Sequence, residues 1–250
     1  MHAMITGASA GIGEALAREF HAAGYEVTLV ARRRDKLDAL AAQLGPKARV
    51  IAHDLSDPAR AAELLAAAGP IDVLVNNAGL QIVDELAVAE AGGAARTMNL
   101  NLMTPMELIR LALPEMLERG SGSIVGVSSL AAISGPPAMT WYAASKAGFA
   151  SFCETLRAEV RGSGVNVVTV YPGPVKTEMA DAAYEIMGGR KGLISLLPEG
   201  NAPALARLVL RAVQKRRARV IYPAFYWTSW VFPRFSTWLT QTFAPRPRAK

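Results

Sequence analysis

Ser129, Tyr142 and Lys146 are the residues of this chain whose types and spacing most directly suggest chemistry. Tyr142 follows Ser129 by thirteen positions, and Lys146 follows Tyr142 by four. If residues 141–160 form a helix, Tyr142 and Lys146 share one helix face. An ammonium beside a phenol stabilises the phenolate, so we expect Lys146 to lower the tyrosine pKa from its usual value of about 10. Such a tyrosine can donate a proton to a carbonyl oxygen or accept one from an alcohol.

The position of Ser129 supports this interpretation. It follows an apolar run, residues 123–127, that is expected to be a buried strand, and its hydroxyl could donate to the same oxygen. The alternative is a surface tyrosine and lysine that share a helix face by chance, because the Y-x-x-x-K pattern is common. Other patterns in the chain are needed to decide between the two.

A glycine-rich turn, Thr6 to Gly13, follows the first predicted strand and precedes the first predicted helix. Its spacing is T-G-x-x-x-G-x-G, which differs from the G-x-G-x-x-G of other dinucleotide folds. Glycines let the backbone approach a pyrophosphate, and a helix N-terminus attracts it through free N–H groups. Glycine turns also serve helix packing, but the place of this one at the start of an alternating strand–helix chain favours phosphate binding.

The end of the second predicted strand indicates which cofactor fits. An acidic residue there would bind the ribose hydroxyls of NAD and repel a 2′-phosphate. This chain has Arg32, Arg33 and Arg34 instead. The planar guanidinium suits phosphate, so the sequence predicts NADP, with Arg32 as the first contact and Arg33 as the second. At least one of the three arginines is expected to face solvent.

Polar and rigid residues follow three further predicted strands. Asp54 could reach an adenine amino group or cap the helix after Pro58. Residues 76–79, Asn-Asn-Ala-Gly, suit backbone bracing and close approach to a ligand, although a simple turn uses the same types. Residues 172–177 form rigid turns against which a nicotinamide ring could rest.

Apolar runs that alternate with helical patterns predict an α/β protein with a buried parallel sheet. At 250 residues, a chain of this class is often a single domain. The predicted strands are residues 2–5, 25–31, 49–52, 71–75, 123–127, 165–170 and 219–222. The predicted helices include residues 14–23, 94–119, 141–160 and 202–217.

Composition excludes several classes of protein. Half of the residues are hydrophobic (51%) and 19% are charged, which argues against extensive disorder. The single cysteine, Cys153, excludes an intrachain disulfide framework and a multi-cysteine metal site, and no metal site is predicted. We expect a packed thiol, a cytoplasmic location and no signal peptide before the first strand.

Charge is unevenly distributed along the chain. The net charge is +6, yet residues 200–250 contain ten Lys or Arg and no acidic residue, because Glu199 is the last carboxylate. A basic, aromatic tail on a mildly acidic body predicts an anionic partner for the tail and no nucleic-acid partner for the core.

Taken in order and at this spacing, the motifs resemble the short-chain dehydrogenase/reductase family. The resemblance covers roughly residues 3–177, with a weaker continuation to about Pro223. It implies a single Rossmann-type domain, a doubly wound parallel sheet in a three-layer α/β/α arrangement, spanning residues 1–223. It also implies hydride transfer between a nicotinamide and a carbonyl or alcohol carbon, and a homo-oligomer, dimer or tetramer.

The resemblance also implies roles for the candidate catalytic residues. Tyr142 would be the general acid/base, and Lys146 would bind the nicotinamide ribose and lower the tyrosine pKa. Ser129 would polarise the substrate oxygen, with Ser128 as the less favoured alternative. An asparagine before strand five would support a proton relay, and Asn101 fits that place better than Asn99.

The expected cofactor contacts come from the same resemblance and share positions at the ends of strands and on the following turns. Ala10 stands where some NADP-using members carry a basic residue. The full set is Gly7, Ser9, Ala10, Gly11, Ile12, Gly13, Arg32, Arg33, Asp54, Leu55, Asn77, Ala78, Gly79, Tyr142, Lys146, Pro172, Gly173, Val175 and Thr177.

Residues 178–200 occupy the place of the family's substrate-binding flap. Their apolar side chains favour a lipophilic substrate, although these could simply pack against the body, and Gly188-Gly189 is a candidate hinge. The apolar side chains are Met179, Met187, Leu193, Ile194, Leu196 and Leu197.

Residues 224–250 form an aromatic and basic extension. Pro233 and Arg234 interrupt it, so it is not expected to span a membrane. Its aromatic and basic residues are typical of peripheral contact with anionic lipid. A terminal helix that closes the substrate pocket, or an oligomer interface, is an equal alternative.

The leading hypothesis is therefore an NADP(H)-dependent oxidoreductase acting on a keto or hydroxy lipid, a steroid-like or an oxoacyl compound. The alternative is a non-catalytic NADP(H)-binding sensor or a membrane-surface interaction protein. A sensor would be free to lose the tyrosine or the lysine, and this chain has both.

Overall fold

Seven parallel strands form the central sheet of the computed structural model, which describes residues 1–189 and 197–244. The strand order is β3-β2-β1-β4-β5-β6-β9. The chain therefore adds β2 and β3 on one side of β1, and then continues with β4 on its other side, so the direction of strand addition reverses at β1 and β4. The strands are β1 (His2–Thr6), β2 (Glu26–Ala31), β3 (Ala48–Ala52), β4 (Val73–Asn76), β5 (Gly122–Val127), β6 (Val165–Pro172) and β9 (Arg219–Tyr222).

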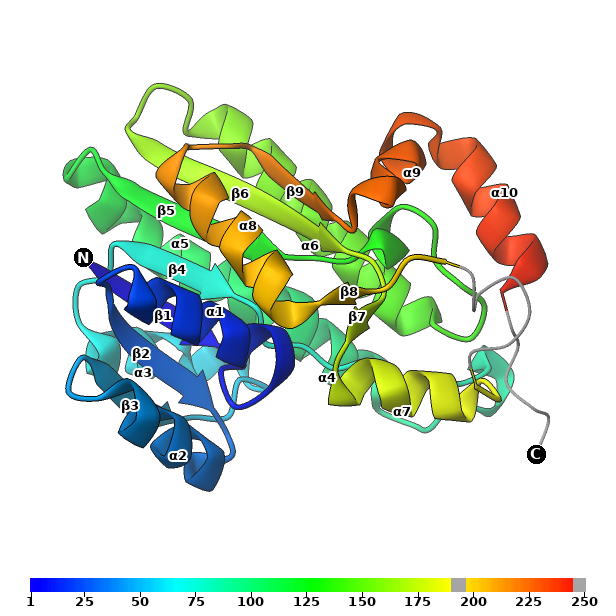
Figure 1. Ribbon diagram of the computed structural model, residues 1–250, viewed down its shortest axis with the longest axis horizontal. Coiled ribbons are helices and arrows are strands. Elements are labelled where there is room, and N and C mark those ends of the chain that lie inside the picture. Colours follow the sequence, from blue (N-terminus) through cyan, green and yellow to red (C-terminus); the bar gives the residue numbers. More distant parts are fainter. Residues whose placement is uncertain (190–196, 245–250) are drawn as a thin grey trace.

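Helices cover both faces of this sheet (Figure 1). One face packs against α1 (Gly11–Ala22), α2 (Arg34–Leu44) and α8 (Ala202–Gln214). The other packs against α3 (Ala61–Ala68), α5 (Thr104–Glu118) and α6 (Thr140–Glu159). The predicted Rossmann-type, doubly wound, three-layer α/β/α single domain is confirmed.

Side chains of alternate direction on the strands build two apolar cores. Ile5, Leu29 and Val125 face α1 and α8, whereas Met4, Leu74 and Ile124 face α5 and α6. A strand covered on both faces must be apolar throughout, which is why the strands appear as continuous apolar runs in the sequence. Cys153 lies in the second core, and burial raises the pKa of its thiol to about 12, as expected for a packed thiol.

The predicted helix over residues 94–119 is divided into three parts. It consists of α4 (Gly93–Met98), a π-helical turn (Asn99–Met103) and α5. Such a turn adds a residue to the helix and re-aims the side chains beside it. Here it places the Asn101 side chain in the interior, next to the loop after β4.

The carboxyl ends of the strands carry the remaining elements (Figure 1). A small parallel pair, β7 (Val175–Lys176) and β8 (Gly200–Asn201), lies beside α7 (Glu178–Ile186). Short 3₁₀ helices occur at Pro58–Arg60, Leu86–Val88, Leu130–Ala132 and Ala224–Tyr226. Gly188 and Gly189, the candidate hinge, have φ angles of +85° and +89°. Leu193, Ile194 and Leu196 of the expected flap lie outside the described residues.

The chain continues into α9 (Trp227–Val231) and α10 (Pro233–Phe243), which lie beyond the carboxyl edge of the sheet, at the upper right of Figure 1. Across the described ranges, none of the helices has the length and apolar character needed to cross a membrane. How this pair sits against the body determines the shape of the cleft described next.

Candidate active site

A cavity of about 880 Å³ opens at the carboxyl ends of β1, β2, β4, β5 and β6. In folds of this class, ligands bind at this edge, where the strand order reverses. Every residue predicted above to contact the cofactor lines the cavity, and so do Ser129 and Ser128. Of the predicted catalytic residues, Asn101 alone is not among those lining residues.

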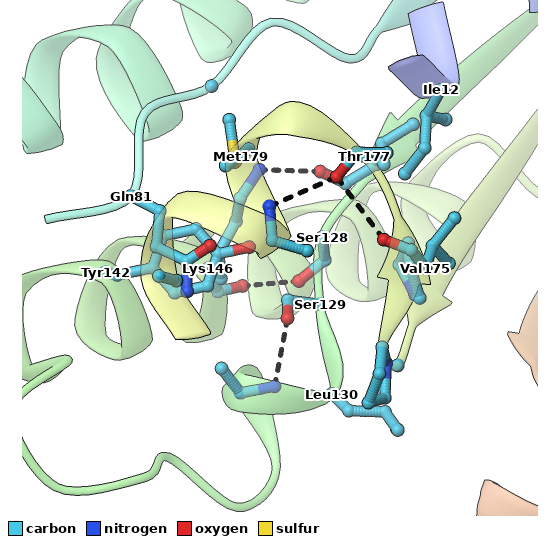
Figure 2. Close-up of a pocket in the computed structure, with 18 of the residues that line it drawn as sticks. Ile12, Gln81, Ser128, Ser129, Leu130, Tyr142, Lys146, Val175, Thr177 and Met179 are labelled. Atoms are coloured by element: carbon cyan, nitrogen blue, oxygen red, sulfur yellow. Dashed lines mark hydrogen bonds between the residues drawn. The ribbon is translucent and has the colours of Figure 1, made fainter. Parts of the chain in front are cut away.

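Ser129 and Tyr142 both line this cavity, and both are labelled in the close-up (Figure 2). Ser129 follows β5 in an extended conformation, with φ −165°, and its Oγ accepts a hydrogen bond of 3.1 Å from the Ala131 N–H. The Ser129 hydroxyl also lies near enough to the Tyr142 phenol to lower the pKa of that phenol. The two groups are therefore placed to share one substrate oxygen.

Ser128 points away from that position. Its Oγ donates a buried hydrogen bond of 2.7 Å to the backbone carbonyl of Lys146, so it fastens the end of β5 to α6. This geometry favours Ser129 over Ser128 as the residue that contacts substrate.

Lys146 lies one helical turn after Tyr142, as its spacing predicts. Its Nζ donates to the Val127 carbonyl at 2.9 Å and lies 5.9 Å from the centroid of the Tyr142 ring. The side chain is buried, and burial lowers its pKa to about 8. A lysine in this environment is still mainly protonated at neutral pH, but its charge is easily lost.

The expected lowering of the Tyr142 pKa is wrong for this structure. Burial raises the pKa of the phenol, and the Ser129 hydroxyl opposes that effect only in part. The Lys146 ammonium faces the Val127 carbonyl instead of the phenol oxygen, which accounts for its failure to offset burial. Tyr142 is therefore a neutral phenol at pH 7, the form that donates a proton.

The glycine-rich turn between β1 and α1 depends on the absence of side chains. A Cβ on Gly13 would lie 2.1 Å from the Gly7 carbonyl oxygen, so only glycine lets α1 begin this close to the turn. Gly11 has φ +58°, and a Cβ there would approach Thr177 at 3.1 Å. No side chain caps the N-terminus of α1. The open turn and uncapped N–H groups are suited to a pyrophosphate.

Asn77 braces this turn from the neighbouring strand, as its position predicts. Its Nδ2 donates to the Thr6 carbonyl at 2.9 Å, and its backbone N–H donates to Thr6 Oγ1 at 3.0 Å. The Ala78 N–H donates to the same hydroxyl. The ends of β1 and β4 are thus held in a fixed relation at the floor of the cavity.

The three arginines after β2 have different surroundings. Arg33 donates to Ser9 Oγ at 3.1 Å and pairs with Glu178 of α7 at 3.6 Å, so it bridges the glycine turn and the flap. Arg34 pairs with Asp38 and lies outside the cavity, as expected for a solvent-facing arginine. Arg32 lines the cavity and is exposed. The donor set at this end matches a phosphate.

Asp54 lines the cavity, and it is not the helix cap that the sequence left as an alternative. The cap of the helix Pro58–Arg60 is Asp57, which accepts from the Ala59 N–H at 3.0 Å. Asp54 accepts from the Ser56 N–H, and this hydrogen bond lowers the pKa of its carboxyl.

Asn101 acts on the loop after β4. Its Oδ1 accepts from the Leu80 N–H at 2.8 Å, while its Nδ2 donates to the Leu80 carbonyl and to Ser145 Oγ on α6. The contacts with Leu80 fix the loop after β4, and the contact with Ser145 joins the π-helical turn to α6. Gly79 lies between Asn101 and Lys146, since a Cβ there would lie 3.3 Å from Asn101 Oδ1 and 3.4 Å from Lys146 Nζ.

The outer half of the cavity contains flap side chains that the sequence singled out, together with residues that it did not. Gln81 lies beside Tyr142 (Figure 2), and its Nε2 donates to Met139 Sδ at 3.2 Å. Several lining residues are apolar and come from α7 and the turn after it, from the 3₁₀ helix Ala224–Tyr226 and from α10. They include the flap residues Met179 and Met187, and also Phe225, Phe235 and Leu239. The aromatic composition of the extension signalled that it could close the pocket, and it does line it.

Comparison with known families decides what kind of site this is. Residues 1–187 match the family model described as short chain dehydrogenase. The chain belongs to the short-chain dehydrogenase/reductase family. Proteins of this family are oxidoreductases that bind nicotinamide cofactors and small-molecule substrates.

Individual relatives cover nearly the whole chain. Dehydrogenase/reductase SDR family member 7B of Rattus norvegicus is 31% identical over 97% of this chain and 77% of its own length. The ketoacyl reductase HetN of a Nostoc species is 34% identical over 87% of this chain and 77% of its own. A solved short-chain dehydrogenase from Sphingobium yanoikuyae in complex with NADPH has a TM-score of 0.81 and 27% identity, and covers 100% of this chain and 98% of its own.

Proposed function

We propose that this protein is an NADP(H)-dependent oxidoreductase that transfers hydride between the nicotinamide and a carbonyl or alcohol carbon of a lipophilic small molecule. The observation that carries the proposal is that Ser129, Tyr142 and Lys146 line the same cleft as the glycine turn and Arg32. Acid/base groups and a phosphate cradle in one cavity are what hydride transfer to a ketone requires.

The residues act on a carbonyl substrate as follows. Ser129 donates a hydrogen bond to the carbonyl oxygen, and the neutral phenol of Tyr142 donates its proton to the same oxygen as negative charge develops there. When bound, the reduced nicotinamide supplies the hydride to the carbonyl carbon. In the opposite direction, Tyr142 accepts the proton of the alcohol. The Lys146 ammonium holds the nicotinamide ribose.

The remaining cofactor residues would hold NADP(H) along the sheet edge. The turn Gly7–Gly13 and the uncapped N-terminus of α1 receive the pyrophosphate, and Arg32 and Arg33 receive the 2′-phosphate. Asp54 and Leu55 would contact the adenine, Asn77, Ala78 and Gly79 would contact the ribose, and Pro172, Gly173, Val175 and Thr177 would contact the nicotinamide. A relative solved with NADPH supports this choice of cofactor.

A lipophilic substrate is supported by the outer half of the cavity. Methionines of α7 and the loop before α6 lie against Tyr142 and are joined by aromatic side chains of the extension. Few charged groups are available there to pair with an ionic substrate. The name of the Nostoc relative, ketoacyl reductase, supports an oxoacyl compound as one form such a substrate could take.

Three further proposals rest on the family resemblance and the tail composition. The protein assembles as a homo-oligomer, a dimer or a tetramer. It acts in the cytoplasm, with peripheral membrane contact through residues 224–250. Residues 1–223 are the catalytic domain and residues 178–200 the substrate flap.

The experiment is NADPH oxidation with a panel of ketones, aldehydes, steroids and oxoacyl thioesters, with NADH as the cofactor control. Tyr142→Phe should lower turnover by about 10²–10⁴-fold, because the proton donor is lost. The Kd for NADPH should stay near the wild-type value. Turnover equal to wild type in Tyr142→Phe would reject the mechanism. NADPH binding without turnover of any substrate would favour the sensor.

A further inference from the structure

The C-terminal helix α10 exposes its apolar face, whereas an ordinary surface helix exposes its polar face. Its apolar side chains, Phe235, Trp238, Leu239 and Phe243, recur at the spacing of one helix face. An amphipathic helix normally buries this face against the body. Here Phe235 is 61% exposed and Trp238 is 55% exposed, and no residue of the helix is buried.

The polar side of α10 makes the contacts with the body. Ser236 Oγ donates to Ser229 Oγ of α9 at 2.9 Å, and it also lies 3.4 Å from Ser134 Oγ. Thr237 Oγ1 donates to the Ile133 carbonyl at 3.2 Å. These hydrogen bonds hold the helix by its small hydroxyl side chains and leave the apolar face outward.

The preceding helix, α9, is anchored firmly enough to fix this orientation. The ring centroids of Trp230 and Tyr171 lie 5.1 Å apart. The Arg219 guanidinium lies 4.8 Å from the centroid of the Trp230 ring. Arg219 also pairs with Glu154 of α6. The tail is therefore part of the folded body, and its outward apolar face is a fixed surface.

Exposed large apolar side chains are concentrated in the tail that contains this face, as far as the described residues go. Eight of the fifteen large apolar side chains that are exposed in the described ranges belong to residues 225–243. Exposed apolar patches of this kind mark a surface that binds a partner. The eight are Phe225, Trp227, Val231, Phe232, Phe235, Trp238, Leu239 and Phe243.

The charge of the tail sequence favours an anionic lipid surface as the partner of these apolar side chains. Arg234 is the one charged residue of the sequence between positions 224 and 244, and basic residues follow at 246, 248 and 250. Aromatic side chains with neighbouring arginine and lysine are suited to the headgroup region of anionic bilayers. A second copy of the chain would bring the same positive charge against it and is less well matched.

The patch is continuous with the active-site cleft. Phe235 and Leu239 belong to the apolar face of α10 and also line the cavity that contains Tyr142. Together with Phe225 and Phe232 they form a rim between the lipid-facing surface and the catalytic residues. An apolar molecule leaving a bilayer at this face would enter the cleft without crossing bulk water.

We infer that α9 and α10 dock on an anionic membrane surface and admit a lipid-dissolved ketone or alcohol directly into the cleft. The lipid nature of the substrate rests on the proposed function, whereas docking does not. The apolar rim keeps the apolar surface of such a substrate out of water, and this burial is favourable by about 25 cal/mol per Å².

The first test is sedimentation with phosphatidylglycerol/phosphatidylcholine vesicles and with phosphatidylcholine vesicles alone. Wild type should bind the anionic vesicles, and Trp238→Ser/Phe243→Ser should bind them at least about tenfold more weakly. Leu117→Ser, an exposed leucine on α5, is the matched control and should bind like wild type. Arg234→Glu should lose affinity for anionic vesicles in particular.

The second test separates docking from chemistry. NADPH oxidation is measured with a long-chain ketone in anionic vesicles and with a short water-soluble ketone. The double variant should lose about tenfold in rate on the vesicle-borne ketone and keep its rate on the soluble one, since neither side chain lines the cavity. Vesicle binding without any ketone turnover would overturn the proposed function and leave docking intact.

Two results would overturn the inference. One is equal vesicle binding by wild type and the double variant, or no binding by either. The other is a smaller oligomer in the double variant, measured by light scattering, with vesicle binding unchanged, which would assign the face to contacts between copies. Circular dichroism and thermal melting of each variant show whether the fold is retained.

Discussion

The Ser128 hydroxyl donates its hydrogen bond to the Lys146 carbonyl, while its neighbour Ser129 turns to Tyr142. Adjacent serines thus have different surroundings, one in the packing between β5 and α6 and one in the cleft.

Substitution of each serine should separate these roles. Ser129→Ala should lower kcat for ketone reduction by about 10²-fold, because one donor to the developing oxyanion is lost. Ser128→Ala should cost about 1 kcal/mol of stability through the lost hydrogen bond and change kcat far less. Steady-state kinetics and urea unfolding of both variants check this. A larger kcat loss in Ser128→Ala would reverse the assignment.

The charge of Lys146 should give cofactor binding a dependence on pH. Burial lowers its pKa to about 8, below the value of about 10.4 in an unfolded chain. Below pH 8 the Lys146 ammonium is present and can hold the ribose. Above pH 8 the folded protein loses this charge, whereas the unfolded chain would still keep it. The Kd for NADPH should therefore rise as the pH passes about 8. Fluorescence titration across this range measures it.

The same shift affects stability with a defined sign. Between pH 8 and the pKa of the unfolded chain, the unfolded state binds more protons, so the Lys146 contribution to folding stability increases with pH.

The control for the pH dependence of cofactor binding is Lys146→Arg. Its guanidinium keeps its charge throughout, so the Kd for NADPH should show no step near pH 8. A step of the same size in that variant would assign the titration to another group.

The raised pKa of Tyr142 should make the two directions of reaction respond differently to pH. At neutral pH the phenol is protonated and serves as the donor for ketone reduction. Alcohol oxidation needs the phenolate, so its kcat should increase steadily with pH, whereas ketone reduction should not. Initial rates in both directions over the same buffers check this, and parallel profiles would contradict it.

Arg32 should determine the preference for NADPH over NADH. It lines the cavity without the links to Ser9 and Glu178 that hold Arg33. Arg32→Ala should raise the KM for NADPH by about tenfold or more and leave the KM for NADH nearly unchanged, because a charged hydrogen bond to phosphate is worth about 1.5–3 kcal/mol. Arg34→Ala, whose arginine pairs with Asp38 outside the cavity, is the control. Equal losses with both cofactors would assign Arg32 a general role.

The sequence was sufficient for the fold and for most of the candidate site, because both depend on local pattern. The strand Arg219–Tyr222 was predicted with its observed bounds, and the glycine turn lies where its spacing places it. Residues at the carboxyl ends of parallel strands converge at one edge of the sheet, so listing them in chain order predicted the lining of a single cleft.

What the sequence could not supply depends on three-dimensional surroundings. Spacing puts Lys146 beside Tyr142, but only the fold shows the ammonium directed to the Val127 carbonyl and the phenol buried. Asp54 and Asp57 are equally good caps by residue type, and backbone geometry selects Asp57. The periodicity of α10 predicts an apolar face, but it does not predict whether that face is buried or exposed.

Glu154 connects the C-terminal tail to α6 through Arg219. It lies on α6, the helix that carries Tyr142 and Lys146, and it accepts hydrogen bonds from Tyr171 and from Arg219, which stacks on Trp230 of α9. One rigid helix therefore sets both the position of the proton donor and that of the distant aromatic wall. Through Glu154, α6 connects the proposed proton donor to the tail, whose side chains Phe235 and Leu239 line the outer cleft.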